Sequence, residues 1–253
     1  MAPPVGHAGR PRATVMISET RDLENHHQDM PSNRLQPVRG VVFDFDGTLV
    51  ATQIDFAGMR RAISDLIHRW GLSASVRVPI EYPLEMVAAG CQVLEDHGEH
   101  SATLKREAMD IIEGFEMQTC PYAAPFPGVL EALELLAARG YRLGIITRNG
   151  HKGVQAITSR YPLHHQVLLT RDDVVQVKPH PEHLLAAIRA LRLTPVDILM
   201  VGDHPTDVMC ARAAGTLSVG VSRDPRRIVE LTRAGADFLI PSVPELIPLL
   251  NGG

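Results

Sequence analysis

Aspartates gather in two short stretches of the sequence, each of which follows an apolar run. In the first, FDFDGTL, Asp44 and Asp46 lie two positions apart, so an extended backbone presents both carboxylates on the same side. Gly47 follows them and permits a sharp turn of the chain. In the second stretch, VGDHPTD, Asp203 and Asp207 bracket another turn. Carboxylates in such places can serve as a nucleophile, as an acid or base, or as ligands of a cation.

Between the two stretches lie polar residues that could bind a phosphoryl group. Thr147, in IITRNG, offers a hydroxyl to a phosphoryl oxygen, and its neighbour Arg148 could contact substrate. Lys178, in VVQVKPHP, offers a positive charge. We therefore expect phosphate chemistry, in which one carboxylate attacks phosphorus and another protonates the leaving oxygen and later activates water.

The charges of these groups predict a metal ion. Three or four carboxylates around a phosphate dianion repel one another, and each pair about 4 Å apart costs roughly 4 kcal/mol at an effective dielectric constant of 20. One lysine cannot offset that repulsion, whereas a divalent cation can. Oxygen ligands favour Mg²⁺ or Ca²⁺ over Zn²⁺, and Mg²⁺ suits a site of few carboxylates and substrate phosphate.

The elements that must position these residues alternate between strand and helix. From Gly40, VVFDF has the pattern of a buried strand, and from Tyr122 onward apolar strands alternate with helices. This pattern predicts an α/β fold, with a Rossmann-like parallel sheet covered by helices on both faces. The expected strands after residue 122 are YRLGIIT, QVLLT, DILMVGD, LSVGV and DFLI. The expected helices are residues 129–138, a segment after Gly150, PEHLLAAIRAL, a segment ending near Gly215, a segment from about Asp224 and a segment after Pro244.

Apolar residues recur at helical spacing in three sets between the first strand and the rest of the sheet. Residues 51–122 are therefore predicted to be an all-helical cap domain inserted into a core of residues 40–50 and 123–253. An insertion at this point lies above the strand ends, where open α/β sheets bind ligands. Residues 1–39 lack either period and are predicted to be a mobile extension. Polar cap residues that could contact substrate are Arg60, Arg61, His68, Arg77, Lys105 and Arg106.

With its motifs in this order, the chain resembles the haloacid dehalogenase superfamily, in the branch of phosphatases with a helical cap. The resemblance runs from about Gly40 to the C-terminus and is carried by DFDGTL, the strand end at Thr147, Lys178 and GDHPTD. It covers neither residues 1–39 nor any cap motif beyond helical character. Dehalogenating members typically lack an acid at the position of Asp46, so its presence favours phosphate chemistry.

The resemblance implies a role for each site residue. Asp44 would be the nucleophile and a metal ligand, and Asp46 the acid and base whose main-chain carbonyl also binds metal. Asp203 would be the second carboxylate ligand. Asp207 would orient metal-bound water or Lys178, while Lys178 and Thr147 would hold the phosphoryl group. The implied function is Mg²⁺-dependent hydrolysis of a small phosphomonoester through an aspartyl-phosphate, with a phosphoglycolate-like acid as the first guess.

Several other interpretations stay open. A phosphomutase of the same fold would use the same residues, a phosphonate or haloacid hydrolase would share the nucleophile, and a non-catalytic protein could bind a phosphorylated ligand. Asp207 could cap the helix that follows it, Lys178 could be a solvated loop residue, and Thr147 could reflect strand propensity. Histidines such as His180 and His183 show no zinc-binding spacing and are predicted to lie at the surface.

Composition narrows the partners and the compartment. A formal net charge of -4 argues against binding to nucleic acid or to an acidic membrane surface. No apolar run approaches the roughly 20 residues of a membrane helix. The three cysteines form no CxxC pair, which favours a reducing, cytoplasmic location. The first residues lack an apolar signal region, although Arg10 and Arg12 leave organelle import open. A monomer or homodimer is expected.

Overall fold

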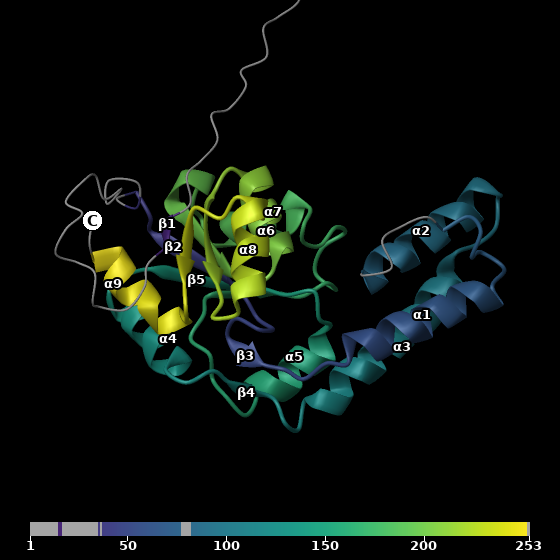
Figure 1. Ribbon diagram of the computed structural model, residues 1–253, viewed down its shortest axis with the longest axis horizontal. Coiled ribbons are helices and arrows are strands. Elements are labelled where there is room, and N and C mark those ends of the chain that lie inside the picture. The colour runs from purple at the N-terminus through teal and green to yellow at the C-terminus, as the bar shows by residue number, and fades with distance from the viewer. Residues whose placement is uncertain (1–14, 17–34, 36, 77–81, 252–253) are drawn as a thin grey trace, which may run out of the picture. The chain divides into compact units, whose positions relative to one another are not determined.

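The computed structural model describes residues 15–16, 35, 37–76 and 82–251, so most of the predicted extension lies outside the described residues. The chain divides into two compact units, whose elements are labelled in Figure 1. The first unit comprises Met1–Ala51, Pro125–Arg148 and Pro162–Gly253, and the second comprises Thr52–Ala124 and Asn149–Tyr161. The second unit thus includes a segment, residues 149–161, that the sequence pattern assigns to the core.

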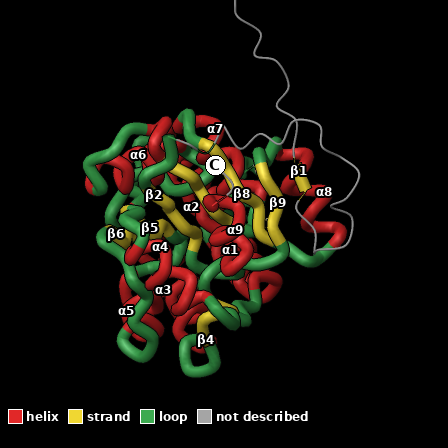
Figure 2. Tube along the Cα trace, turned by 90° about the vertical axis from the view of Figure 1, so that its left-hand side faces the viewer, coloured by secondary structure: helices red, strands yellow, loops and turns green. Residues whose placement is uncertain are grey.

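A parallel sheet forms the centre of the first unit, in the strand order β1-β9-β8-β7-β2-β5-β6. Several of these strands are seen side by side in Figure 2. The α/β class predicted from the sequence is confirmed. The strands are β1 (Val15–Met16), β2 (Gly40–Asp44), β5 (Arg142–Ile146), β6 (Val167–Leu169), β7 (Ile198–Gly202), β8 (Leu217–Val221) and β9 (Phe238–Ile240).

The sheet is buried on both faces, as a parallel sheet must be. Val42 of β2 packs into an apolar cluster with residues of α6 and α7. Its neighbours Val41 and Phe43 point to the opposite face, because side chains alternate along a strand, and both are fully buried. Figure 1 shows α4 and α9 on the other side of the sheet from α6 and α7. The helices of this unit are α4 (Val129–Ala138), α6 (Pro181–Ala190), α7 (Pro205–Ala214), α8 (Pro225–Ala234) and α9 (Leu246–Asn251), with short 3-10 turns η2 (Pro195–Asp197) and η3 (Val243–Glu245).

Strand register brings the polar residues of the sequence to one edge of the sheet. Asp44, the last residue of β2, pairs with Ile146, so Thr147 lies one residue beyond that level. On the other side, Phe43 pairs with Val201 of β7, two residues before Asp203. Because all three strands run in the same direction, their carboxyl ends deliver these side chains to the same place.

The second unit is built from three helices around one apolar cluster, as the periodicity predicts. The helices are α1 (Phe56–Arg69), α2 (Pro83–Asp96) and α3 (Ala102–Thr119), which lie against one another in Figure 1. The fourth helix, α5 (His151–Thr158), contacts α3. The buried Glu116 carboxylate on α3 accepts a hydrogen bond from the Gly150 N–H that precedes α5, over 3.3 Å. That contact satisfies a donor at a helix N-terminus and explains why α5 belongs with the inserted helices.

The chain passes between the units through a two-stranded sheet of β3 (Val50–Ala51) and β4 (Ala124–Pro125). All three cysteines are free thiols, and Cys120 and Cys210 are buried. Within the part of the chain that the structure describes, no helix is both long and apolar enough to span a bilayer.

Candidate active site

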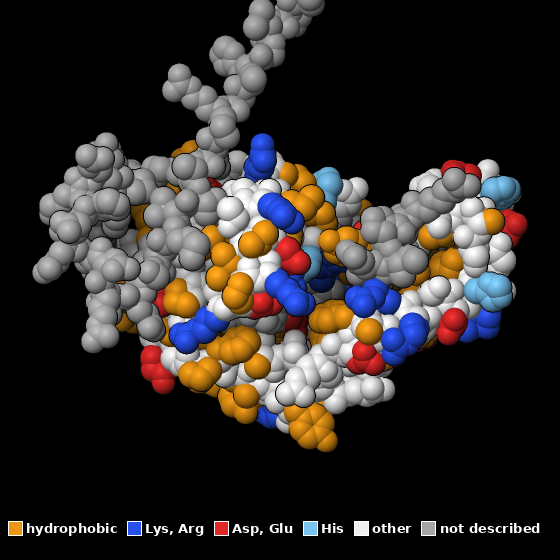
Figure 3. Space-filling view, in the orientation of Figure 1, with side chains coloured by type: hydrophobic (Ala, Val, Ile, Leu, Met, Phe, Trp, Pro, Cys, Tyr) orange, Lys and Arg blue, Asp and Glu red, His pale blue; other side chains and the backbone are white. Residues whose placement is uncertain are grey.

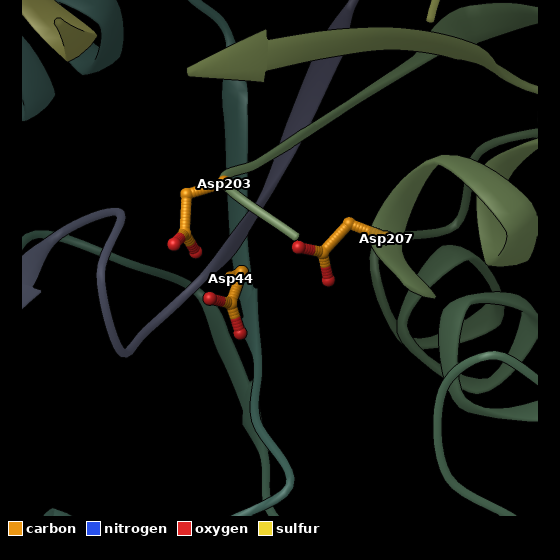
Figure 4. Close-up of side chains that lie close together, drawn as sticks. All are labelled: Asp44, Asp203 and Asp207. Atoms are coloured by element: carbon orange, nitrogen blue, oxygen red, sulfur yellow. The ribbon is translucent and has the colours of Figure 1, made fainter. Parts of the chain in front are cut away.

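Three aspartates converge at the carboxyl edge of the sheet, as Figure 4 shows. Asp44 ends β2, Asp203 directly follows β7, and Asp207 lies in the first turn of α7. One carboxylate oxygen from each lies within 4.8 Å of the others. Asp44 and Asp207 are buried, and Asp203 is half-buried. The sequence motifs, 159 residues apart between Asp44 and Asp203, therefore form one cluster.

Lys178 is the cation at the centre of this cluster. Its ammonium contacts the Asp44 carboxylate, and its Nζ atom lies 2.7 Å from Oδ1 of Asp207. The side chain is only 2% exposed. A solvated loop lysine, the alternative reading of the sequence, is thus wrong: this residue is a buried ion-pair partner of two aspartates.

The turn after β2 is shaped by its close approach to Asp203. Gly47 has a positive φ of 80°, and a Cβ atom at this position would lie 2.5 Å from Oδ2 of Asp203. Only glycine meets both demands. The buried Thr48 hydroxyl lies 3.2 Å from Oδ1 of Asp203 and 3.4 Å from Oδ2 of Asp44. Thr48 can therefore donate its one proton to either carboxylate, a role that the sequence motif alone does not predict.

Asp46 lies in the same turn and contacts the end of β5. The Thr147 hydroxyl donates a hydrogen bond to Oδ2 of Asp46 over 3.1 Å. Thr147 itself is fully buried, and its N–H donates to the Leu169 carbonyl at the end of β6. The sequence predicted that Thr147 binds a phosphoryl oxygen. A hydroxyl has one proton to donate, so it can serve Asp46 or a phosphoryl oxygen, but not both at once.

His183 corrects a sequence prediction. It was expected at the surface, but it is fully buried beneath the site, where its Nε2 atom lies 3.1 Å from the Leu169 carbonyl. Burial lowers the pKa of His183 to about 4, so the ring is neutral near pH 7. A neutral ring with Nε2–H donates to the same carbonyl that Thr147 contacts. His183 therefore supports the strand end that carries Thr147, and no spacing motif could have revealed this.

Asp207 combines two of the roles considered for it. Its Oδ2 atom accepts a hydrogen bond from the N–H of His204, the residue that caps α7, over 3.0 Å. Its Oδ1 atom faces Lys178. Helix capping and orientation of the lysine are therefore compatible, because the two oxygens of one carboxylate divide them.

Burial and mutual repulsion shift the pKa values of Asp44 and Asp203. Burial raises the pKa of Asp44 well above its usual range; Lys178 opposes this shift, and the neighbouring aspartates add to it. Burial and repulsion from Asp207 likewise raise the pKa of Asp203 to about 6. Burial lowers the pKa of Lys178, but its attraction to Asp207 and Asp44 outweighs burial and keeps the net pKa above its ordinary value. The ammonium is therefore charged at neutral pH.

The cluster fits a metal ion. Its possible ligands are all oxygens, which suit a hard divalent cation, and the raised pKa values of Asp44 and Asp203 show that further positive charge would stabilise the ionised carboxylates. Asp46 lies two residues after Asp44 in the same turn. The acidic cluster can thus hold a cation.

Other predicted contacts stay predictions. The Arg148 main-chain carbonyl accepts a hydrogen bond from Arg171 over 3.1 Å, which assigns no role to the Arg148 side chain. Arg77 lies outside the described residues. The remaining basic candidates of the cap belong to the second unit: Arg60, Arg61 and His68 on α1, and Lys105 and Arg106 on α3.

A parallel α/β sheet with an aspartate cluster at its carboxyl edge and helices inserted after the first strand defines a class of hydrolase fold. Residues 41–221 match the family of haloacid dehalogenase-like hydrolases, so the chain belongs to that family. The expected membership and hydrolase class are confirmed.

Relatives and solved structures agree with this assignment. A phosphoglycolate phosphatase of Yersinia pseudotuberculosis is 28% identical over 86% of this chain and 95% of its own length. A haloacid dehalogenase-like hydrolase domain-containing protein of Arabidopsis thaliana is 30% identical over 75% of this chain and 73% of its own. The crystal structure of a haloacid dehalogenase-like hydrolase from Bacteroides fragilis has a TM-score of 0.61 at 21% identity, and covers 83% of this chain and 99% of its own.

The ion pairs of Lys178 predict a pH-dependent loss of stability when that residue is replaced. Lys178→Met keeps an apolar stem but leaves Asp44 and Asp207 buried without a cation, which should cost about 3–5 kcal/mol of unfolding free energy at pH 7 without metal. The carboxylate pKa values of the folded variant then lie above their unfolded values. Its stability should therefore be greater at pH 5, and should fall as pH rises through those values.

Urea denaturation at the two pH values measures this effect. Lys152→Met is the matched control, because the Lys152 side chain is 70% exposed and forms an ion pair with Glu113, whose side chain is 35% exposed. A loss below about 1 kcal/mol for Lys178→Met, or a loss that does not depend on pH, would contradict the electrostatic description of the cluster.

Proposed function

We propose that this protein is a Mg²⁺-dependent phosphatase that hydrolyses a small phosphorylated metabolite through an aspartyl-phosphate on Asp44. The observation that carries the proposal is the convergence of Asp44, Asp203 and Asp207 around the buried ammonium of Lys178. This arrangement places a carboxylate nucleophile beside preorganised positive charge, which phosphoryl transfer requires.

Asp44 is suited to attack phosphorus because Lys178 opposes the rise in its pKa that burial causes, and a bound cation would favour the ionised carboxylate further. Lys178 contacts Asp44, and solvent hardly reaches this ion pair because both side chains are at most 10% exposed. The lysine can also bind an oxygen of the transferring phosphoryl group. Asp207 holds the ammonium in place from the other side.

Asp46 is suited to the transfer of protons. In the first step Asp44 forms a bond to phosphorus, the bond to the leaving oxygen breaks, and Asp46 gives its proton to that oxygen. In the second step Asp46 takes a proton from the water that attacks the aspartyl-phosphate, which releases phosphate and restores Asp44. The hydrogen bond from the Thr147 hydroxyl holds Asp46 in place. If that hydroxyl donates to a phosphoryl oxygen of the substrate instead, Asp46 is released for proton transfer.

The residues that would hold Mg²⁺ are the carboxylates of Asp44 and Asp203 and the main-chain carbonyl of Asp46. When bound, the cation supplies positive charge to the carboxylates and to the phosphoryl oxygens. The Thr48 hydroxyl lies within hydrogen-bond distance of both carboxylates and can donate its one proton to either of them.

The substrate class follows from the relatives. The phosphatase of Yersinia pseudotuberculosis that matches 86% of this chain is named for phosphoglycolate. A small phosphorylated acid of that kind is therefore the first substrate to test, with sugar phosphates and nucleotides beside it.

The nucleophile is tested by the hydrolysis of p-nitrophenyl phosphate. The wild-type protein should release inorganic phosphate with Mg²⁺ and not with excess EDTA, and Asp44→Asn should release none, because an amide cannot form the covalent intermediate. Glu134→Gln, which changes an exposed carboxylate on α4, should retain wild-type turnover. Activity of Asp44→Asn equal to wild type would remove Asp44 as the nucleophile, and return of phosphate to substrate without its release would indicate a mutase.

The role of Asp46 as acid and base is tested with the variant Asp46→Asn. This variant keeps the main-chain carbonyl and the carboxylates of Asp44 and Asp203, but it loses the proton donor for the leaving group. We expect kcat to fall by about 10²-fold or more at saturating Mg²⁺. The fall should be smaller for a substrate with a good leaving group, such as p-nitrophenol, than for an alkyl phosphate. A kcat within threefold of wild type on both substrates would exclude this role.

A further inference from the structure

A pocket with a volume of about 640 Å³ lies beside the aspartate cluster at the ends of β8 and β9. Every residue that lines it belongs to the first unit. Its volume is in the range of sites for small organic molecules. The lining residues are Gly47, Thr48, Phe126, Pro127, Asp203, Val221, Ser222, Arg223, Asp224, Arg227, Pro241, Ser242, Val243 and Pro244.

This pocket is separate from the place where substrate must react. Neither Asp44 nor Lys178 lines it, so its occupant does not meet the nucleophile or the lysine. Asp46 does not line it either, whereas the leaving group of a substrate must lie within hydrogen-bond reach of its acid. The pocket meets the catalytic cluster only at the turn of Gly47 and Thr48 and at Asp203.

Two arginines, Arg223 and Arg227, line the pocket. The Nε atom of Arg223 donates to the Pro241 carbonyl over 3.3 Å, which fixes the side chain between the ends of β8 and β9. Among the described residues Arg223 forms no ion pair, so its terminal nitrogens are available to a ligand. Arg227 pairs over 2.9 Å with Glu230 on the same helix.

The two acidic residues that line the pocket, Asp203 and Asp224, both accept hydrogen bonds from neighbouring groups. Asp203 accepts the Thr48 hydroxyl and belongs to the aspartate cluster. Asp224 caps α8 by accepting the N–H of Arg226 over 3.0 Å. Arg223 forms no ion pair among the described residues, and Arg227 keeps N–H donors beyond its contact with Glu230. Both guanidinium groups can therefore still bind an oppositely charged ligand in a planar, two-pronged contact.

Apolar side chains make up much of the remaining wall. Phe126 is 37% exposed although it is aromatic, and the prolines and Val243 extend the apolar surface beside it. Figure 3 shows hydrophobic and basic side chains close together around the position that α8 occupies in Figure 1. A flat apolar body on Phe126 with an anionic group at the arginines would satisfy both parts of the lining.

We propose that this pocket binds a second small molecule, an organic anion with a flat apolar body and a carboxylate or phosphate group, at a site distinct from that of the substrate. Its anionic group contacts Arg223 and Arg227, and its body packs on Phe126. Because the pocket shares Thr48 and Asp203 with the catalytic cluster, its occupant lies next to residues on which catalysis depends. Its separation from the substrate rests on the proposed function, whereas the binding of the anion itself does not.

The probe for this site is 2-naphthoate, which carries one carboxylate on a flat apolar ring system. Calorimetric titration of the metal-free, full-length protein should show saturable binding, and acetate, which lacks the rings, should bind at least tenfold more weakly. Arg223→Gln should weaken the binding of 2-naphthoate by about tenfold, because a charge-assisted contact is lost. Arg226→Gln is the matched control, since Arg226 is exposed in the first turn of α8, three residues after Arg223, and does not line the pocket. The affinity of this variant for 2-naphthoate should stay within twofold of wild type.

A further variant separates the pocket from the catalytic site. Asp44→Asn should bind 2-naphthoate within twofold of wild type, because Asp44 does not line the pocket. A marked gain of affinity in Asp44→Asn would place the probe at the catalytic site and overturn the proposal. Absence of saturable binding, or equal effects of Arg223→Gln and Arg226→Gln, would overturn it as well.

Discussion

The structure depends on one electrostatic constraint: aspartates that are buried together must be balanced by positive charge that the protein holds in place. Lys178 supplies part of that charge, because it contacts both Asp44 and Asp207 while 2% exposed. Solvent cannot stabilise these carboxylates, so the pKa of Asp44 rises despite the lysine. A cation that binds the cluster relieves the remaining repulsion, and the phosphatase chemistry that we propose uses the same positive charge.

The fold meets this constraint by bringing distant segments to one sheet edge. The parallel register of β2, β5 and β7 places Asp44, Thr147 and Asp203 at neighbouring strand ends. Close contact then requires particular local structure, because Gly47 must have no side chain where Asp203 approaches. Membership of the haloacid dehalogenase-like hydrolases is consistent with this gathering of carboxylates at one edge of the sheet.

Sequence patterns predicted the alternating elements and the carboxylates that converge, because buried strands and turn residues have strong local signals. They did not predict contacts that depend on side-chain direction. Thr48 lies within hydrogen-bond distance of two carboxylates and Thr147 contacts Asp46, yet either threonine could have faced elsewhere from its position in the chain. Burial of His183 and the grouping of α5 with the inserted helices arise from tertiary packing, which no local period encodes.

The most direct test of the central claim is the stabilisation of the protein by Mg²⁺, measured by thermal unfolding without substrate. A cation that binds only the folded cluster should raise the unfolding free energy by about 2.7 kcal/mol at a concentration 100 times its Kd. We predict a clear rise in Tm for the wild type and for Glu134→Gln, and the loss of most of that rise in Asp203→Asn. An equal rise in Asp203→Asn, or none in the wild type, would contradict the claim that these carboxylates share one cation.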